Sequence, residues 1–277
     1  FKQKTAYEIM PSLVGSEMCI RDSPVMIGLK AGSWFDEAFF ALLYSEGGTL
    51  FDENLDPIFE TESGPIYDVI EWVASAINDT GIMPQKVLDM TAVDVQQAFK
   101  NGDTAFVIVP GYMMREFNTP GISKVAGQAE VSIMPGATHE TDGYTRMYLM
   151  GNSALESEAK QWAAWHLIEF LGGRTTVHGE TAYHVARRWA VENGLGFSIL
   201  SLWDDPAVQR TFSAMGDTNV MQAQKKLARS KEGMSAPWFA EWMSFVRTEV
   251  QKALLRQATT TEVLENIKQQ WIDLKSE

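Results

Sequence analysis

The chain has 277 residues, of which 45% are hydrophobic and 21% are charged, as is typical of a globular protein with a hydrophobic core. Its net charge of −13 argues against nucleic acid as a partner, because a phosphate backbone binds basic surfaces. No apolar run approaches the roughly 20 residues that a membrane-spanning helix needs. The length suits one large domain or two ordinary ones.

Residues 7–23 read YEIMPSLVGSEMCIRDS, which resembles the translation of a sequencing adaptor. We therefore interpret residues 1–23 as a non-native, disordered segment that should pack against nothing, and leave it out of the fold. The single cysteine, Cys19, lies inside it, so the rest of the chain can hold no disulfide, thiol nucleophile or thiolate metal site. We also expect the natural start of the protein to be absent, so the lack of a signal peptide says nothing about its compartment.

The spacing of apolar residues after this segment predicts helices that alternate with short strands. An apolar stripe at helical spacing runs from Ile66 to Ile77, directly after Pro65, which suits the first turn of a helix. In chain order, we expect a strand at 25–29, helices at 34–45, 65–77 and from about 91 to 101, and strands at 105–109 and 131–134.

The second half of the sequence is mostly helical. A polar stretch at 137–145 reads as a crossing or hinge, and Ser153 with Glu156 forms a capping box that predicts a helix reaching Leu171. Further helices are expected at 181–192, from Asp205-Pro206, from Pro237, and from a second capping box at Thr259 and Glu262. Helices with a few apolar strands between them predict an α/β fold class.

The segment from Gly102 to Tyr112 is the most informative stretch. A helix ends at Gly102, the apolar run 105–109 reads as a buried strand, and Pro110-Gly111 breaks it. Tyr112 then follows the carboxyl end of the strand, where ligands of open α/β sheets bind. On spacing alone, a core tyrosine after a turn is the alternative.

The run Ala98–Ala105 (AFKNGDTA) resembles the AAFxxGKAAM signature of bacterial ABC-importer extracellular solute-binding proteins. The sugar-binding group, which is maltose-binding-protein-like, is the most similar. Gly111-Tyr112 resembles that group's Gly-Pro-Trp, whose aromatic ring stacks on the ligand, and residues 150–171 and 245–250 resemble two further stretches. The resemblance rests on the order and spacing of these motifs and covers residues 24–277.

The resemblance implies a periplasmic-binding-protein-like (type II) two-lobed hinge fold that is incomplete because the chain is truncated at its N-terminus. Residues 24–137 and 204–277 would form most of the larger, C-terminal-type lobe. Residues 138–203 would form a fragment of the N-terminal-type lobe. The main chain would cross between the lobes near 137–145 and 202–206.

The function implied is that of the extracytoplasmic solute-binding component of an ABC importer, periplasmic or a cell-surface lipoprotein. It would bind a sugar or polyol in the interlobe cleft, as a monomer without a cofactor, and deliver it to the importer's membrane permease. The alternatives are a non-sugar ligand, or a glycoside-processing enzyme that uses an Asp/Glu pair. The four histidines show no metal-binding spacing.

The expected ligand contacts follow from the same resemblance, with Tyr112 the foremost. For Tyr112, Trp34 and Phe35 the alternative is core packing; for Asp36 it is a helix N-terminal acid favoured by the dipole, and for Arg115 a solvated charge. Met243 competes with the two C-terminal tryptophans for the place of the family's stacking aromatic. The other expected contacts are Trp34, Phe35, Asp36, Arg115, Tyr144, Arg146, Trp238 and Trp242.

Overall fold

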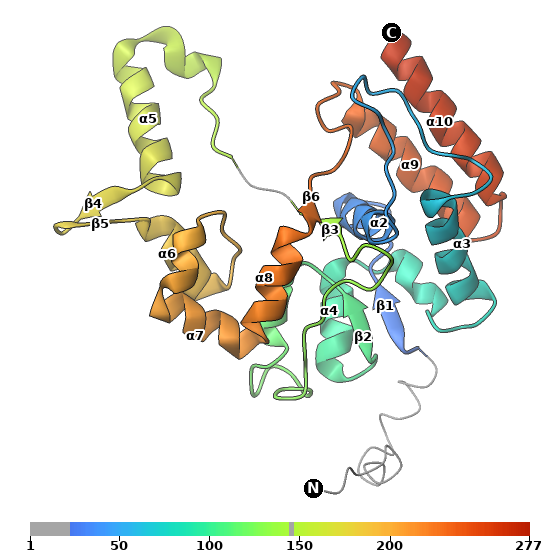
Figure 1. The fold of residues 1–277 in the computed structure, drawn as a ribbon, viewed down its shortest axis with the longest axis horizontal. Helices are drawn as coiled ribbons and strands as arrows, with labels where there is room; N and C mark the ends of the chain where they lie inside the picture. The colour runs from blue at the N-terminus through green and yellow to red at the C-terminus, as the bar shows by residue number, and fades with distance from the viewer. Residues whose placement is uncertain (1–22, 144–146) are drawn as a thin grey trace, which may run out of the picture.

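The computed structural model describes residues 23–143 and 147–277. The adaptor-like segment, apart from Ser23, therefore lies outside the described residues, and the expectation that it packs against nothing stays a prediction. Figure 1 shows a helical body, an extended arm on the other side, and the connecting strands β3 and β6 between them. No helix in the described ranges is long and apolar enough to cross a bilayer.

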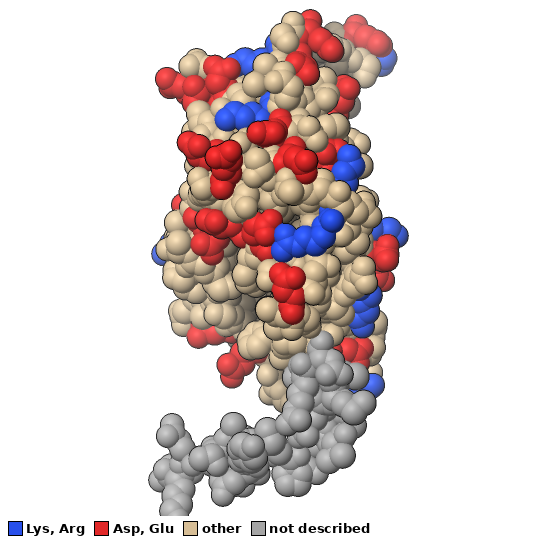
Figure 2. Space-filling view, turned by 90° about the vertical axis from the view of Figure 1, so that its right-hand side faces the viewer, with Lys and Arg blue, Asp and Glu red and all other residues tan. Residues whose placement is uncertain are grey.

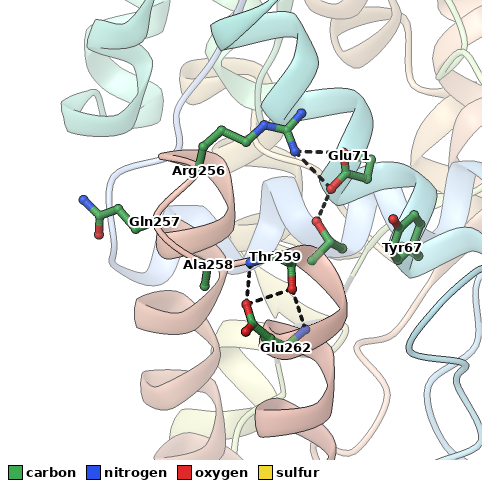
Figure 3. A pocket seen from close by; sticks show the side chains of 8 residues that line it. Tyr67, Glu71, Arg256, Gln257, Ala258, Thr259 and Glu262 are labelled. Atoms are coloured by element: carbon green, nitrogen blue, oxygen red, sulfur yellow. Dashed lines mark hydrogen bonds and ion pairs between the residues drawn. The ribbon is translucent and has the colours of Figure 1, made fainter.

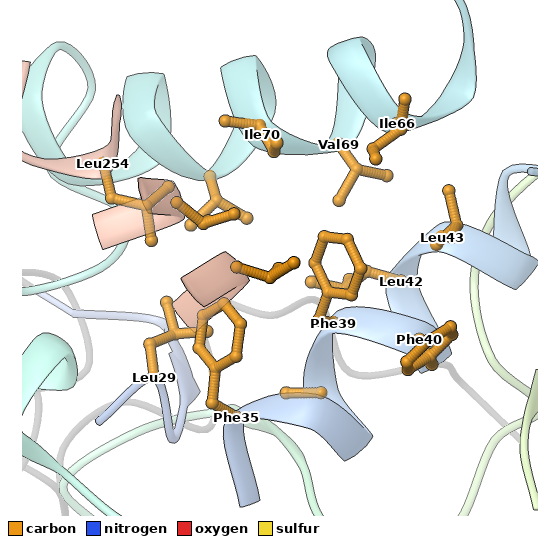
Figure 4. Packing of buried hydrophobic residues seen from close by; sticks show 14 of the residues in the cluster. Leu29, Phe35, Phe39, Phe40, Leu42, Leu43, Ile66, Val69, Ile70 and Leu254 are labelled. Atoms are coloured by element: carbon orange, nitrogen blue, oxygen red, sulfur yellow. The ribbon is translucent and has the colours of Figure 1, made fainter. Parts of the chain in front are cut away.

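The body is held together by helices that pack around one large hydrophobic core. The buried stripe of α3 runs from Ile66 to Ile77, which confirms the helix predicted from its spacing. Figure 4 shows Phe35 and Phe39 packed beneath Val69 and Ile70. The helices concerned are α2 (Ser33–Ser45), α3 (Pro65–Asn78), α9 (Phe239–Leu254) and α10 (Thr260–Ser276).

Two short parallel strands lie against this core, β1 (Val25–Ile27) and β2 (Phe106–Ile108). The helix α4 (Ala92–Asn101) precedes β2 and ends at Gly102, whose φ of 79° only glycine adopts without strain. The strand at 105–109 is confirmed, but its expected burial is wrong, because Phe106 is 68% exposed. Within the described residues β2 pairs only with β1, so much of its surface stays uncovered.

The strand expected at 131–134 is also wrong, since this stretch has no regular secondary structure. The backbone N–H of Met134 donates to the side-chain Oε1 of Gln224 at 2.6 Å. A side chain therefore satisfies the donor that a neighbouring strand would otherwise use. The apolar side chain of Met134 is still buried, which explains why the sequence resembles a strand.

The arm comprises the turn η5 (Asn152–Glu156), helix α5 (Glu158–Gly172) and a hairpin of β4 (Thr175–Val177) and β5 (Glu180–Ala182). The predicted helix forms, but not from the expected capping box, since Ser157 caps it by accepting from the backbone N–H of Lys160. Residues 152–156 form a separate turn instead. None of the residues of α5 is buried, so its apolar side chains are exposed: Trp162, Trp165, Leu167 and Phe170.

A second, smaller core joins the arm to the rest of the molecule. Its buried members, Ala190, Val208, Phe212, Met215 and Met221, come from three helices. This core lies on both sides of residue 204, where we expected a lobe boundary. Asp205 caps the second of these helices, at the predicted start. Residues 181–182 form a strand instead of the beginning of the first helix, and the third helix was not predicted. The helices are α6 (His184–Asn193), α7 (Pro206–Met215) and α8 (Thr218–Lys226).

The body and the second core are connected by two strands that run side by side. β3 (Thr141–Asp142) pairs in parallel with β6 (Ala228–Arg229). β3 falls within the stretch 137–145 that we expected to cross between lobes. β6 comes after α8 and therefore well beyond the 202–206 region expected for the second crossing. We call β3 and β6 the junction strands.

Candidate functional site

Tyr112 lies in the turn η4 (Gly111–Glu116), directly after the Pro-Gly break that ends β2. The turn is anchored to α4 because Gln96 Nε2 donates to the Met113 carbonyl at 2.8 Å. The side chain of Met113 is buried, whereas that of Met114 packs against the second core. The half-buried Tyr112 therefore sits where the body and the second core meet.

Arg115 is exposed on the same turn and lies close to the carboxyl end of α6. A Cβ built on Gly194 would come within 3.5 Å of Arg115 Cδ and 3.2 Å of Met215 Sδ. Because Gly194 has no side chain, the aliphatic part of the Arg115 side chain can approach the end of α6. Tyr112 and Arg115 are brought together on η4, beside the helices of the second core.

Asp36 lies in the first turn of α2 and is buried, with its carboxylate engaged by Arg247 of α9. Arg247 Nε donates to Asp36 Oδ1 at 2.8 Å, and Nη2 donates to Oδ2 at 2.7 Å. This hydrogen bonding raises the pKa of the Arg247 guanidinium. A fork of two parallel bonds fixes α2 against α9 and uses much of the acceptor capacity of Asp36.

A group of three charged residues lies where α2 meets the junction strands, and we call it the junction cluster: Glu37, Asp142 and Lys231. Lys231 Nζ lies 3.9 Å from Glu37 Oε1 and 3.6 Å from Asp142 Oδ2. The ammonium is shared between two carboxylates at ion-pair rather than close hydrogen-bond distance. One ammonium therefore faces two carboxylates in this cluster.

Asp142 is the most unusual member of this cluster. Its side chain is 5% exposed, and its Oδ1 has no hydrogen-bond partner among the described residues. Burial raises the pKa of the Asp142 carboxyl to about 6, although Lys231 opposes the shift. Buried polar atoms without partners are rare and point to strain or function.

Arg229 of β6 and Tyr44 of α2 connect the junction strands to the body. The Arg229 guanidinium lies 4.3 Å from the centre of the Tyr44 ring and donates to Glu140 at 2.9 Å. The Tyr44 hydroxyl donates to the Ser230 carbonyl and accepts the Glu232 N–H, both at 2.9 Å. Burial raises the pKa of the Tyr44 hydroxyl further above neutral pH. These contacts hold the backbone of the junction cluster in place.

Two of the other aromatic residues expected at the site, Phe35 and Trp242, lie in the body core instead. Phe35 is buried in the body core and stacks on Phe39, with ring centres 5.9 Å apart. Trp242 is also fully buried, and its indole donates to the Ile267 carbonyl at 2.9 Å. Phe35 thus takes the core packing that we gave as its alternative, and Trp242 also belongs to the body core.

Trp238 is half-buried and packs edge-on against Trp271 at 5.7 Å. Its buried indole nitrogen has no partner in the part of the chain that the structure describes. Tyr144, Arg146 and the side chain of Trp34 lie outside the described residues. Their roles as ligand contacts stay predictions.

The junction cluster was missed by reasoning from the sequence. Asp142 falls in the polar stretch singled out as a crossing, but an acid in such a stretch reads as a solvated loop residue. Glu37 and Lys231 carry no local signal either, because only the pairing of β3 with β6 brings distant segments together. The predicted crossing at 137–145 was the one feature of the sequence that pointed to this part of the molecule.

A separate hollow of about 400 Å³ lies between α3 and the turn from α9 to α10. Figure 3 shows that its polar groups already bind one another. Arg256 Nη1 donates to Glu71 at 2.8 Å, and Thr259 caps α10 with Glu262. None of the expected ligand contacts that the structure describes lines it.

The surface charge agrees with the acidic composition. Figure 2 shows acidic side chains spread over the face that carries α3 and α10, with fewer basic ones between them. In the described residues, no group of three or more histidine, cysteine, aspartate or glutamate side chains is placed to hold a metal ion. The absence of a metal and a cofactor stays a prediction.

No protein-family model and no curated protein matches the chain. Solved structures do. Maltose-bound MalE3 of T. maritima superposes with a TM-score of 0.73 at 18% identity, covering 94% of this chain and 64% of that one. An ABC transporter solute-binding protein from Agrobacterium radiobacter K84, in complex with ribitol, gives a TM-score of 0.69 at 14% identity and covers 93% and 64%. A third, from Thermotoga lettingae TMO with α-D-tagatose, gives 0.67 at 13% and covers 94% and 60%.

These similarities define the class of fold. The chain has the α/β, type II periplasmic-binding-protein-like fold of ABC-transporter solute-binding proteins, over the part of that fold that it spans. It spans less than two thirds of the length of these structures. The predicted fold class and the resemblance that implied it are confirmed at the level of fold.

Proposed function

We propose that this chain belongs to a solute-binding protein that captures a sugar or polyol for an ABC importer. The observation that carries the proposal is the fold. At least 93% of the chain superposes on solute-binding proteins whose structures contain maltose, ribitol or tagatose. Because these identities lie below 20%, the ligand class is our inference and not a property transferred from them.

The geometry around Tyr112 supports this proposal. Tyr112 follows the carboxyl end of β2, on a turn whose Met114 packs against the second core. A ligand clamped by two lobes would contact both sides of such a turn. An aromatic face covers the apolar face of a sugar, and a few polar groups fix its hydroxyls. Arg115 is one such group on the same turn. Binding of this kind needs no covalent chemistry.

The proposal places the protein outside the cytoplasm, either free in the periplasm or anchored at the cell surface. Its macromolecular partner would be the membrane permease of the importer, which receives the ligand. We expect a monomer, because a closing two-lobed clamp is complete in one chain. The fold similarity supports this setting through the transporters to which the similar structures belong.

Isothermal titration calorimetry on the gene's full product tests the proposal. The panel comprises maltose, maltotriose, ribitol, D-mannitol and D-tagatose, with amino acids and polyamines as competing classes. We expect at least one sugar or polyol to bind and to be recovered intact. Binding of only amino acids or polyamines would contradict the ligand class. Hydrolysis of the bound sugar would instead favour a glycoside-processing enzyme.

A further inference from the structure

The junction cluster contains a carboxylate oxygen that has no donor. Asp142 Oδ2 faces the Lys231 ammonium at 3.6 Å, whereas Oδ1 is buried and has no partner within residues 23–143 and 147–277. The ammonium is already shared with Glu37 Oε1 at 3.9 Å. An ionised carboxylate that leaves half of its acceptor capacity unused in a buried place is costly. A bound group that donates a hydrogen bond would remove this cost.

The position of Asp142 indicates where such a donor comes from. The residue lies on β3, one of the two junction strands, and β3 packs against the first helix of the body, α2. Glu37, the cluster member with the most exposed side chain, is 22% exposed, so the cluster is not sealed from solvent. A ligand held between the body and the second core would meet this strand from the solvent side.

We propose that Asp142 is a specificity-determining residue of the ligand site, whose Oδ1 accepts a hydrogen bond from a hydroxyl of the bound sugar or polyol. This inference rests on the proposed function and adds a residue that the sequence did not indicate. Lys231, which also faces Glu37, holds the carboxylate in place as a positioning residue. The hydroxyl would supply the donor that Asp142 Oδ1 lacks among the described residues.

The same arrangement links binding to proton release. Burial raises the pKa of Asp142 to about 6 in the free protein. A hydroxyl that donates to Oδ1 stabilises the ionised carboxylate, so the pKa is lower in the complex. Affinity is therefore greatest above this pKa and decreases as the pH falls through it, by about tenfold between pH 7 and pH 5.

Other charged groups surround Asp142, but none supplies the missing donor. Asp36 and Glu37 of α2 add negative charge, and Arg247 of α9 is engaged by Asp36. The Tyr44 hydroxyl donates to the Ser230 carbonyl. The groups that act on Asp142 from α2 and from the turn after β6 are Asp36, Glu37, Tyr44 and Lys231. Arg229, the register partner of Asp142 on β6, pairs with Glu140 and Glu232.

Calorimetry with maltose, ribitol and D-tagatose at about pH 7, 6 and 5, in buffers of different ionisation enthalpy, tests the inference. For the sugar that binds, we expect about tenfold weaker binding at pH 5 than at pH 7, with proton release near pH 6. Asp142→Asn should bind more weakly and without this pH dependence. Glu265→Gln, which removes an exposed carboxylate of α10, is the matched control and should behave as the wild type.

A carbon-13 NMR titration of the Asp142 carboxyl gives a second readout that does not depend on the variant's folding. Its midpoint should lie near 6 in the free protein and move down when the sugar is added. Binding that is independent of pH, or a midpoint that the sugar leaves unchanged, overturns this inference and leaves the proposed function standing. Failure of all five sugars and polyols of the calorimetry panel to bind at pH 7 overturns both.

Discussion

The body and the arm both contain helices rich in large apolar side chains, yet only one of them has a core. α9 buries Trp242, Val246 and Val250 against its neighbours, whereas α5 exposes Trp162 and Trp165. The contrast shows that apolar spacing predicts a helix but does not predict what covers its apolar side. Most of the stability of a protein helix comes from that covering layer.

α5 has local interactions and a limited contact with α6, but no buried residue. Ser157 caps its first turn, and Lys160 pairs with Glu156 at 2.5 Å. Each such contact contributes about 1 kcal/mol or less. The helices α9 and α10, in contrast, share a buried aromatic group in which Trp242 and Trp271 pack edge-on at 5.0 Å. The two regions should therefore respond very differently to equivalent substitutions.

Truncating one tryptophan in each region gives the largest expected difference. Trp242→Ala should lower the free energy of unfolding by about 3–5 kcal/mol, because it leaves a cavity in the body core. Trp162→Ala should change it by less than about 0.5 kcal/mol, because the ring is 56% exposed. Urea unfolding followed by circular dichroism measures both. Equal losses would show that the arm is as well packed as the body.

Among the aromatic residues predicted for the ligand site, Tyr112 should affect binding and Phe35 should affect stability. Tyr112→Ala should weaken binding of the sugar identified in the panel by about 1–3 kcal/mol, on the scale of aromatic stacking on a flat partner, with little loss of stability. Phe35→Ala should instead lower stability by about 3 kcal/mol or more, because its ring is buried in the core. Calorimetry and urea unfolding on both variants separate the two effects. A large stability loss with unchanged affinity in Tyr112→Ala would make it a core residue.

Features set by neighbouring residues in the sequence could be predicted. The helix after Pro65, the helix capped by Asp205 and the one capped by Thr259 and Glu262 all begin as expected. Each depends on a few adjacent residues and on apolar spacing. The turn that carries Tyr112 also follows from a local signal, the Pro-Gly pair after an apolar run.

Features set by tertiary contacts could not be predicted. The burial of β2 depends on which strands lie beside it. The residues of 105–109 do not indicate which strands those are. Likewise, Asp142 and Lys231 meet only because β3 pairs with β6. Ser153 met the pattern of a helix cap and Ser157 did not, yet the helix starts at the second serine.

The junction between the two regions offers an intermediate effect. The pKa of Asp142 is raised above its unfolded value, so the group favours the folded state below the unfolded pKa of about 4, and this contribution is lost as the pH rises through about 6. Asp142→Asn should therefore raise the free energy of unfolding by about 1–2 kcal/mol near pH 7 and leave it nearly unchanged near pH 4. Urea unfolding at both pH values measures this. A destabilised variant at pH 7 would mean that the pair with Lys231 outweighs the cost of burial.

The smallest expected difference concerns the helix caps of the two regions. Thr259→Ala removes the cap of α10, which is packed in the body core, and should lower the free energy of global unfolding by about 1 kcal/mol. Ser157→Ala removes the cap of α5, which has no buried residue, and should leave global unfolding unchanged while amides near the start of α5 exchange faster with solvent. Ser153→Ala is the matched control, because Ser153 lies in the preceding turn and does not cap α5. Urea unfolding with amide hydrogen exchange distinguishes these outcomes. If Ser157→Ala lowered global stability as much as Thr259→Ala does, α5 would unfold together with the body, and the arm would be part of one cooperative unit.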